Sequence, residues 1–147
     1  MIKEKLLTKS LYLRGLQCEK SLWLKINNSD VLEDLDKAIL QIFETGSKVG
    51  HEACKLFPGG KRISFEDTTR SERIALTKQW ILDGVSTIYE ATFEYDGVLV
   101  MVDILNRDSD GNFEIYEVKS SSWNSKKKLK DIDTYIKDAS IQYYVLN

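Results

Sequence analysis

The chain has 147 residues, a formal net charge of −2, 42% hydrophobic residues and one proline, which is typical of a folded globular domain with a sizeable core. No apolar run approaches membrane-spanning length, and the first seven residues lack the uninterrupted apolar region of a secretory signal, so we expect a cytoplasmic protein. Two cysteines are too few for a disulfide framework or a closed zinc site, and the slight negative charge gives no indication of nucleic-acid binding.

The N-terminal part of the chain is predicted to be helical. Leucines and a tryptophan in residues 10–26 fit a helix that breaks near residues 15–18. A longer amphipathic helix is predicted over residues 35–57. Gly46 and Gly50 lie one turn apart inside it, and an interior glycine costs roughly 1 kcal/mol relative to alanine. We therefore expect the backbone of this helix to approach another element closely.

Turn and capping signals divide the second half of the chain. Thr69 and Glu72 have the spacing of a capping box, which opens a helix that Gly84 ends. Asp96-Gly97 is a strong signal for a two-residue hairpin. Three strands are predicted, at residues 87–95, 98–105 and 112–120, and helical spacing of apolar residues returns from Ile132 onward.

We expect one domain over residues 1–147, with a helical part at 1–60 and a part at 61–147 made of a helix, the strands and a C-terminal helix. The fold class is α/β, more closely α+β: a mainly antiparallel ribbon of three strands, extended by another strand and flanked by helices. The sequence ends inside the apolar pattern of its last helix, which suggests a fragment of a longer chain or a missing partner surface.

Two carboxylates and a lysine occur where strands are usually apolar. Asp103 interrupts the most apolar stretch, residues 98–105, and Glu117-Val118-Lys119 follows in the next predicted strand. If the face that carries Asp103 is the core face, each buried ion costs several kcal/mol unless a partner or a metal compensates it. A solvated face is the ordinary alternative in a chain with 30% charged residues, but acid-x-Lys occurs once in the sequence. A divalent cation is the natural compensation.

An acid on each of two adjacent strands, followed by a lysine, suits metal-assisted hydrolysis of phosphodiesters. Asp103 and Glu117 can hold a hard cation, which polarises the phosphate and lowers the pKa of a bound water. Lys119 can orient that water or offset charge on the phosphate, and the backbone carbonyl of Val118 is a further ligand.

These residues, in this order, resemble the PD-(D/E)xK nuclease superfamily and, within it, the RecB-type exonucleases that include the CRISPR-associated nucleases. The chain is most similar to a bacterial family of RecB-like nuclease domains. The likeness covers nearly the whole chain, in six ordered segments at residues 16–24, 50–52, 89–93, 102–105, 117–121 and 142–145.

The resemblance implies a restriction-endonuclease-like core and a site for Mg²⁺ or Mn²⁺ made of His51, Asp103, Glu117 and the carbonyl of Val118, with Lys119 as the catalytic lysine. It also implies exonuclease-like cleavage of DNA ends or single strands, as in DNA repair. Without the family, a lone helical histidine is more often structural. An imidazole ligand favours manganese more than an all-oxygen site does.

Glu90 and Gln142 are two further candidates. Glu90 either supports a second cation or is a paired surface acid. Gln142 falls where the family has a glutamine-tyrosine helix motif that contacts DNA, but Leu146 occupies the position of that tyrosine. Tyr143 and Tyr144 follow Gln142 instead, and core packing is the simpler interpretation for at least one of them.

DNA contacts are also predicted after the lysine motif, where Trp123 precedes the basic run Lys126, Lys127, Lys128 and Lys130. Such a run is otherwise a solvated loop. Cys18 matches the first cysteine of iron–sulfur members of the family, but the other three would follow the glutamine motif, so this chain alone supports no cluster.

Two other functions compete with the nuclease. One is a non-catalytic nuclease-fold module that binds nucleic acid or a protein partner, and its mark would be a lost ligand. The other is a small-molecule or zinc-binding domain that uses His51 and Cys54, three residues apart on a helix, but further ligands at suitable spacing are missing.

Overall fold

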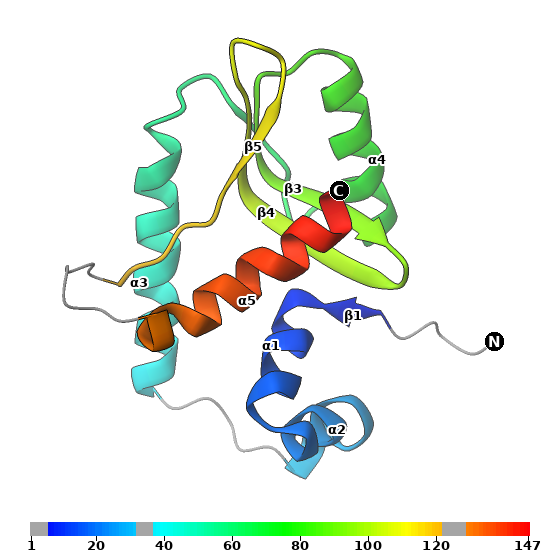
Figure 1. The fold of residues 1–147 in the computed structure, drawn as a ribbon, viewed down its shortest axis with the longest axis vertical. Helices are drawn as coiled ribbons and strands as arrows, with labels where there is room; N and C mark the ends of the chain where they lie inside the picture. The colour runs from blue at the N-terminus through cyan, green and yellow to red at the C-terminus, as the bar shows by residue number, and fades with distance from the viewer. Residues whose placement is uncertain (1–5, 32–36, 122–128) are drawn as a thin grey trace.

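The computed structural model describes residues 6–31, 37–121 and 129–147 (Figure 1). In chain order the elements are β1 (Leu7–Thr8), α1 (Lys9–Gln17), α2 (Glu19–Asn27), a 3₁₀ turn (Ser29–Val31), α3 (Lys37–Cys54), β2 (Lys61–Arg62), α4 (Arg70–Leu82), β3 (Thr87–Tyr95), β4 (Val98–Arg107), β5 (Phe113–Tyr116) and α5 (Leu129–Leu146). The mixed α and β composition confirms the predicted fold class at this level.

The strands form one mixed sheet in the order β1-β4-β3-β2, and β5 also pairs with β4. β3, β4 and β5 are antiparallel, as predicted, whereas β1 and β2 add short parallel pairs at β4 and β3. β1 pairs with the start of β4, at Val98, and β5 pairs with its end, from Ile104 onward. The middle of β4, including Asp103, therefore falls between these two partners.

Local signals in the sequence explain most element boundaries. Asp96 and Gly97 have φ angles of 48° and 72°, the positive values that a tight type I′ hairpin turn needs. The capping box of α4 is present in both directions: Thr69 N–H donates to Glu72 Oε2 at 2.7 Å, and Glu72 N–H donates to Thr69 Oγ1 at 3.3 Å. The predicted break in the first helix is confirmed and lies at Cys18, between α1 and α2.

The third predicted strand is too long. β5 ends at Tyr116, not at residue 120. Beyond that point the backbone N–H of Val118 donates to the side chain of Asp103 at 2.7 Å. Glu117 and Lys119 therefore lie on an extension that follows the strand, and the sheet ladder does not hold them.

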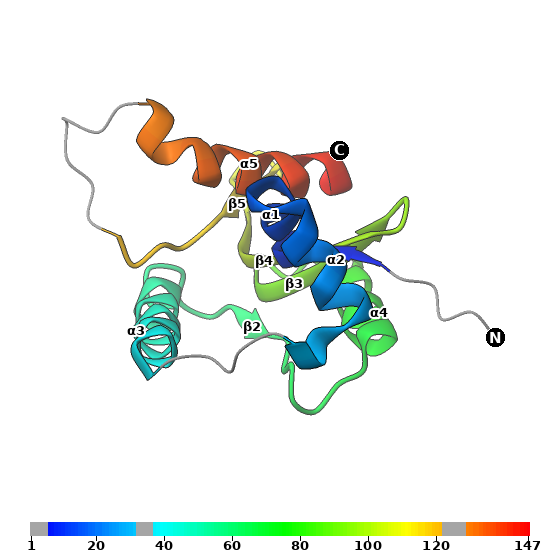
Figure 2. The ribbon, with the colours of Figure 1, turned by 90° about the horizontal axis from the view of Figure 1, so that it is seen from below.

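The core consists of two clusters. One packs under α4 and contains Ile63, Ile88, Ala91, Val102 and Leu105. The other joins β4 to α5, with α1 beside them, and contains Val98, Val100, Ile141 and Val145. Figure 2 shows α5 and α1 on one side of the strands and α4 on the other.

Asp103 does not lie on the core face of β4, which corrects that part of the sequence analysis. Val98, Val100, Val102 and Ile104 are buried, whereas Leu99, Met101 and Asp103 are half-buried. From Val98 to Ile104 the strand therefore buries the side opposite Asp103, and Asp103 faces a cleft. Leu105, on the same side as Asp103, is again part of the core.

Helix α3 lies beside the sheet (Figures 1 and 2), and its glycines do not serve a close contact. A Cβ atom added at Gly46 or Gly50 would meet nothing within 4 Å, so the predicted close approach is wrong. Both glycines line the cleft that separates α3 from the sheet. Among the helices of the described residues, none has the length and apolar character to cross a membrane.

Candidate functional site

A cleft of about 1050 Å³ lies between α3 and the sheet. It brings together the residues in which the sequence analysis placed the chemistry, from segments far apart in the chain. Its lining includes His51 of α3, Arg62 of β2, Glu90 of β3, Asp103 of β4, and Glu117, Val118 and Lys119 after β5. One wall is therefore the sheet with the β5 extension, and the other is α3.

Asp103 is a half-buried carboxylate whose negative charge has few neighbouring groups to offset it. Among the described residues its one hydrogen bond comes from the backbone N–H of Val118, 2.7 Å from Oδ2. Burial raises the pKa of Asp103 above its usual value, and the charge of Glu117 raises it further, while the Val118 hydrogen bond offsets part of this. A carboxylate in this situation gains from a nearby cation.

Glu90 lies beside Asp103 on the neighbouring strand, in an unusual backbone conformation. The β3–β4 ladder pairs Tyr89 with Ile104 and Ala91 with Val102, and Glu90 and Asp103 lie between these pairs. Glu90 has a φ of 61°, which costs a non-glycine residue on the order of 1 kcal/mol. Strain of this kind is concentrated at functional sites.

The side chain of Glu90 is only partly compensated. Arg62 Nη1 lies 3.2 Å from Glu90 Oε1, in an ion pair that is more than one-third exposed on both sides. Burial raises the pKa of Glu90, the charge of Asp103 raises it further, and Arg62 offsets part of the increase. Glu90 is thus a paired acid, as one interpretation expected, and it also lines the cleft.

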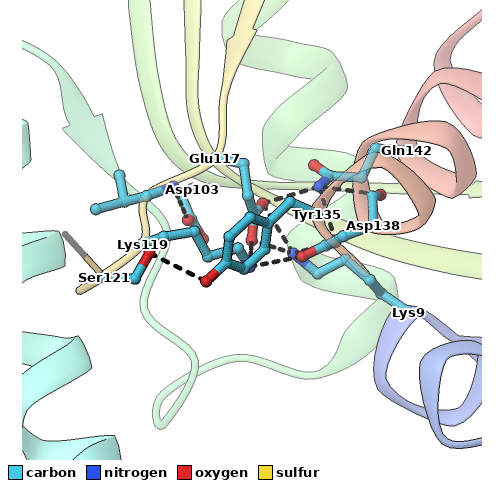
Figure 3. A network of polar contacts seen from close by, with 9 residues as sticks. Lys9, Asp103, Glu117, Lys119, Ser121, Tyr135, Asp138 and Gln142 are labelled. Carbon is cyan, nitrogen blue, oxygen red and sulfur yellow. Dashed lines mark hydrogen bonds and ion pairs between the residues drawn. The ribbon is translucent and has the colours of Figure 1, made fainter. Parts of the chain in front are cut away.

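Glu117 contrasts with these two acids because donors surround it (Figure 3). Lys9 Nζ lies 2.9 Å from both carboxylate oxygens. Lys119 Nζ lies 2.7 Å from Oε1, and Gln142 Nε2 lies 2.8 Å from Oε2. Two ammonium groups and an amide therefore hold this carboxylate in one place.

Asp138 is a second carboxylate of the same cluster, and the sequence analysis missed it. Its Oδ2 lies 2.6 Å from Lys119 Nζ, and its Oδ1 lies 3.3 Å from both Lys9 Nζ and Gln142 Nε2. The residue is 2% exposed. Burial by itself raises the pKa of Asp138, but Lys119 and Lys9 outweigh it, and the pKa lies below its usual value.

A sequence signal existed for one of the two missed residues. Asp138 lies four positions before Gln142 in a predicted helix, so both side chains share one helical face. Lys9 gave no such signal, because its contact with Glu117 spans 108 positions of the chain.

Gln142, which the sequence analysis named as a further candidate, contacts Glu117 and Asp138. It is 1% exposed, and its amide nitrogen faces Glu117 and Asp138. If the amide were flipped, its oxygen would face two carboxylate oxygens and repel them. The amide nitrogen is therefore the atom that faces, and donates to, Glu117 and Asp138.

His51 lies on the other wall of the cleft. Its side chain is exposed on α3, and it lines the same cleft as Asp103 and Glu117. Among the described residues, no three His, Cys, Asp or Glu side chains lie close enough together to hold a metal ion. His51 therefore shares the cleft with the two acids, without forming a ligand set with them in this arrangement.

The remaining candidates lie elsewhere. Tyr143 is 64% exposed and lines a separate cavity of about 250 Å³, and Tyr144 is also exposed and donates to Asp96 at 2.9 Å, so core packing is wrong for both. Cys18 is exposed and unpaired. The structure does not describe Trp123, Lys126, Lys127, Lys128 or the side chain of Lys130.

Comparisons of the chain with protein-family models, with curated proteins and with solved structures found no match. What the cleft can do follows from its own side chains. Asp103 and Glu90 are carboxylates that a divalent cation would stabilise, Glu117 is fixed beside them, and Lys119 supplies a positive charge at the edge of the same cleft.

Proposed function

We propose that this chain is a divalent-metal-dependent nuclease that hydrolyses DNA phosphodiester bonds, as an exonuclease acting on ends or single strands. The observation that carries the proposal is the shared cleft: Asp103, Glu117 and Lys119 line it from one wall and His51 from the other. Acid and lysine residues at this spacing suit phosphodiester hydrolysis. The preference for ends or single strands rests on the family resemblance.

In this proposal each residue has a distinct role. Asp103, Glu117 and the carbonyl of Val118 bind Mg²⁺ or Mn²⁺, which would polarise the scissile phosphate. Lys119 orients the attacking water or offsets charge on the phosphate. His51 completes the ligand set, which requires its imidazole to come closer to Asp103 than it lies here.

The proposal includes a restriction-endonuclease-like core. Its support is the antiparallel arrangement of β3, β4 and β5, with one acid on β4 and the other directly after β5. Helices on both faces of the sheet enclose these strands (Figure 2). Glu90 is the acid that would support a second cation or orient the first.

The cleft also supports a path for the DNA backbone. Arg62 and Lys119 line it beside the acids. The basic run that begins at Lys126 follows Lys119 closely in the sequence. Contacts of these groups with phosphates would give an affinity that falls with salt and does not depend on base sequence.

A cleavage assay tests this function. End-labelled single-stranded and double-stranded DNA is incubated with the protein and Mn²⁺, Mg²⁺ or a chelator, in parallel with Asp103→Ala and Lys119→Ala. Glu114→Gln is a matched control, because Glu114 is an exposed acid on β5 that pairs with Tyr116. We expect metal-dependent cleavage in the wild type and the control, and a loss of at least about 10²-fold in the two site variants.

Two outcomes would contradict the proposal. Metal-dependent cleavage that survives both site substitutions would mean that the assigned residues are wrong. No cleavage by the wild type, together with retained binding of metal and DNA, would favour a non-catalytic module that binds nucleic acid.

A further inference from the structure

The side chains that hold Glu117 and Lys119 come from outside the cleft. β5 ends at Tyr116, so the sheet ladder does not fix the two residues. Lys119 Nζ instead lies 2.7 Å from Glu117 and 2.6 Å from Asp138 (Figure 3). Glu117 lines the cleft, whereas Asp138 lies behind it on α5. Lys119 is therefore held between one carboxylate that faces the cleft and one that does not.

Asp138 is costly to bury, and its contacts explain how the fold retains it. Its side chain is 3% exposed, and an isolated carboxylate in such surroundings would lose several kcal/mol of hydration. Lys119, Lys9 and Gln142 together occupy both of its oxygens. Because the group is paired this fully, it stays ionised and fixed.

The position of Asp138 is also fixed by packing. Ile141 and Val145, on the same helix, pack against Val98 and Val100 of β4. This contact holds α5 on the sheet and so fixes where Asp138 lies relative to the residues that follow β5. The anchor does not depend on the cleft or on anything bound there.

We propose that Asp138 is the positioning residue for Lys119: it keeps the lysine ammonium fixed next to Glu117, at the edge of the cleft, when Glu117 coordinates a cation. This inference rests on the proposed function. If Glu117 held a divalent cation, its carboxylate would attract the two nearby ammonium groups less strongly. Asp138 would then remain as the carboxylate in contact with both Lys119 and Lys9.

The test is steady-state cleavage at saturating metal by Asp138→Asn, which keeps the shape and removes the charge. Asp133→Asn is the matched control, because Asp133 is an exposed acid on the same helix, paired with Lys137 at 2.6 Å. We expect kcat to fall at least about tenfold in Asp138→Asn, with KM for DNA within about twofold, and no change in the control. Circular dichroism checks the fold of each variant, and Asp138→Ser is the second neutral variant if Asp138→Asn does not fold.

A double variant separates positioning from a general structural role. In a Lys119→Met background we expect Asp138→Asn to change the residual kcat by less than about twofold, because the residue through which it acts is gone. A full additional loss in that background, or wild-type kcat in Asp138→Asn alone, would overturn the inference and leave the proposed function intact. A wild-type protein that does not cleave would overturn both.

Discussion

The acids of this protein fall into two groups that differ in how they are compensated. Asp103 and Glu90, on the central strands, each have a raised pKa. Glu117 and Asp138 share two lysines and a glutamine amide. The first group is short of positive charge and the second is balanced.

The difference indicates which acids of the site would gain from a bound ligand and which are already neutralised by neighbouring side chains. The balanced group needs nothing further in order to stay ionised, and it fixes Glu117 and Lys119 in place. The unbalanced group would gain from a bound cation, and it lies where the ladder between β3 and β4 is interrupted at Glu90.

The largest expected effect is on catalysis. Asp103→Asn should lower kcat by about 10³-fold, because it removes a charged ligand of the proposed cation. Glu90→Gln should lower kcat by roughly tenfold, because Glu90 supports the site and is already paired with Arg62. Single-turnover cleavage at saturating Mn²⁺ measures both. Equal losses of kcat in the two variants would mean that Glu90 contributes as much to catalysis as Asp103, contrary to the proposal.

The next effect is on stability. Lys9→Met should lower the free energy of unfolding by about 1–3 kcal/mol, because it leaves Glu117 and the buried Asp138 with one lysine between them. Arg62→Met should cost about 0–1 kcal/mol, because its ion pair with Glu90 is exposed. Urea denaturation with a chelator present measures both values. A larger loss of unfolding free energy for Arg62→Met than for Lys9→Met would show that the pair between Arg62 and Glu90 stabilises the fold more than the pairs of Lys9 do.

The sequence predicted those parts of the fold that depend on local chemistry. The turn at Asp96 and Gly97, the cap formed by Thr69 and Glu72, and the break at Cys18 each depend on residues within a few positions of one another. β1 and β2 were out of reach, because a strand of two residues has no period to detect. The end of β5 was also misjudged, because the contact between Val118 and Asp103 is tertiary.

The candidate site also contains residues that the sequence predicted and residues that only the tertiary structure reveals. Asp103 and the Glu117-Val118-Lys119 motif were identified because charged residues stood in apolar stretches, and the cleft does bring them together. Lys9 escaped detection because a lysine at a helix start is ordinary in sequence. Asp138 was missed because only its spacing from Gln142 sets it apart from the other acids of a charged helix. Their importance comes from burial and pairing, which exist only once α1 and α5 lie on the same face of the sheet.

The smallest expected effect is the pH dependence of stability with a chelator present, and it should have opposite signs in the two groups. An acid with a raised pKa contributes stability below its unfolded pKa, about 4, and loses it as pH rises through the folded value. Asp103 is such a group. Asp103→Asn should therefore be slightly more stable than the wild type at pH 7, and the gap should close as pH falls toward 4.

Asp138 should behave in the reverse way. An acid with a lowered pKa contributes stability above its unfolded pKa and loses it as pH falls through the folded value. Asp138→Asn should therefore be less stable than the wild type at pH 7, and the deficit should shrink below about pH 4. Urea denaturation at pH 7, 5 and 3 measures both variants against the wild type. Deficits of the same sign for Asp103→Asn and Asp138→Asn at pH 7 would mean that Asp103 is compensated as fully as Asp138. The site would then have no uncompensated carboxylate at Asp103 to attract a cation.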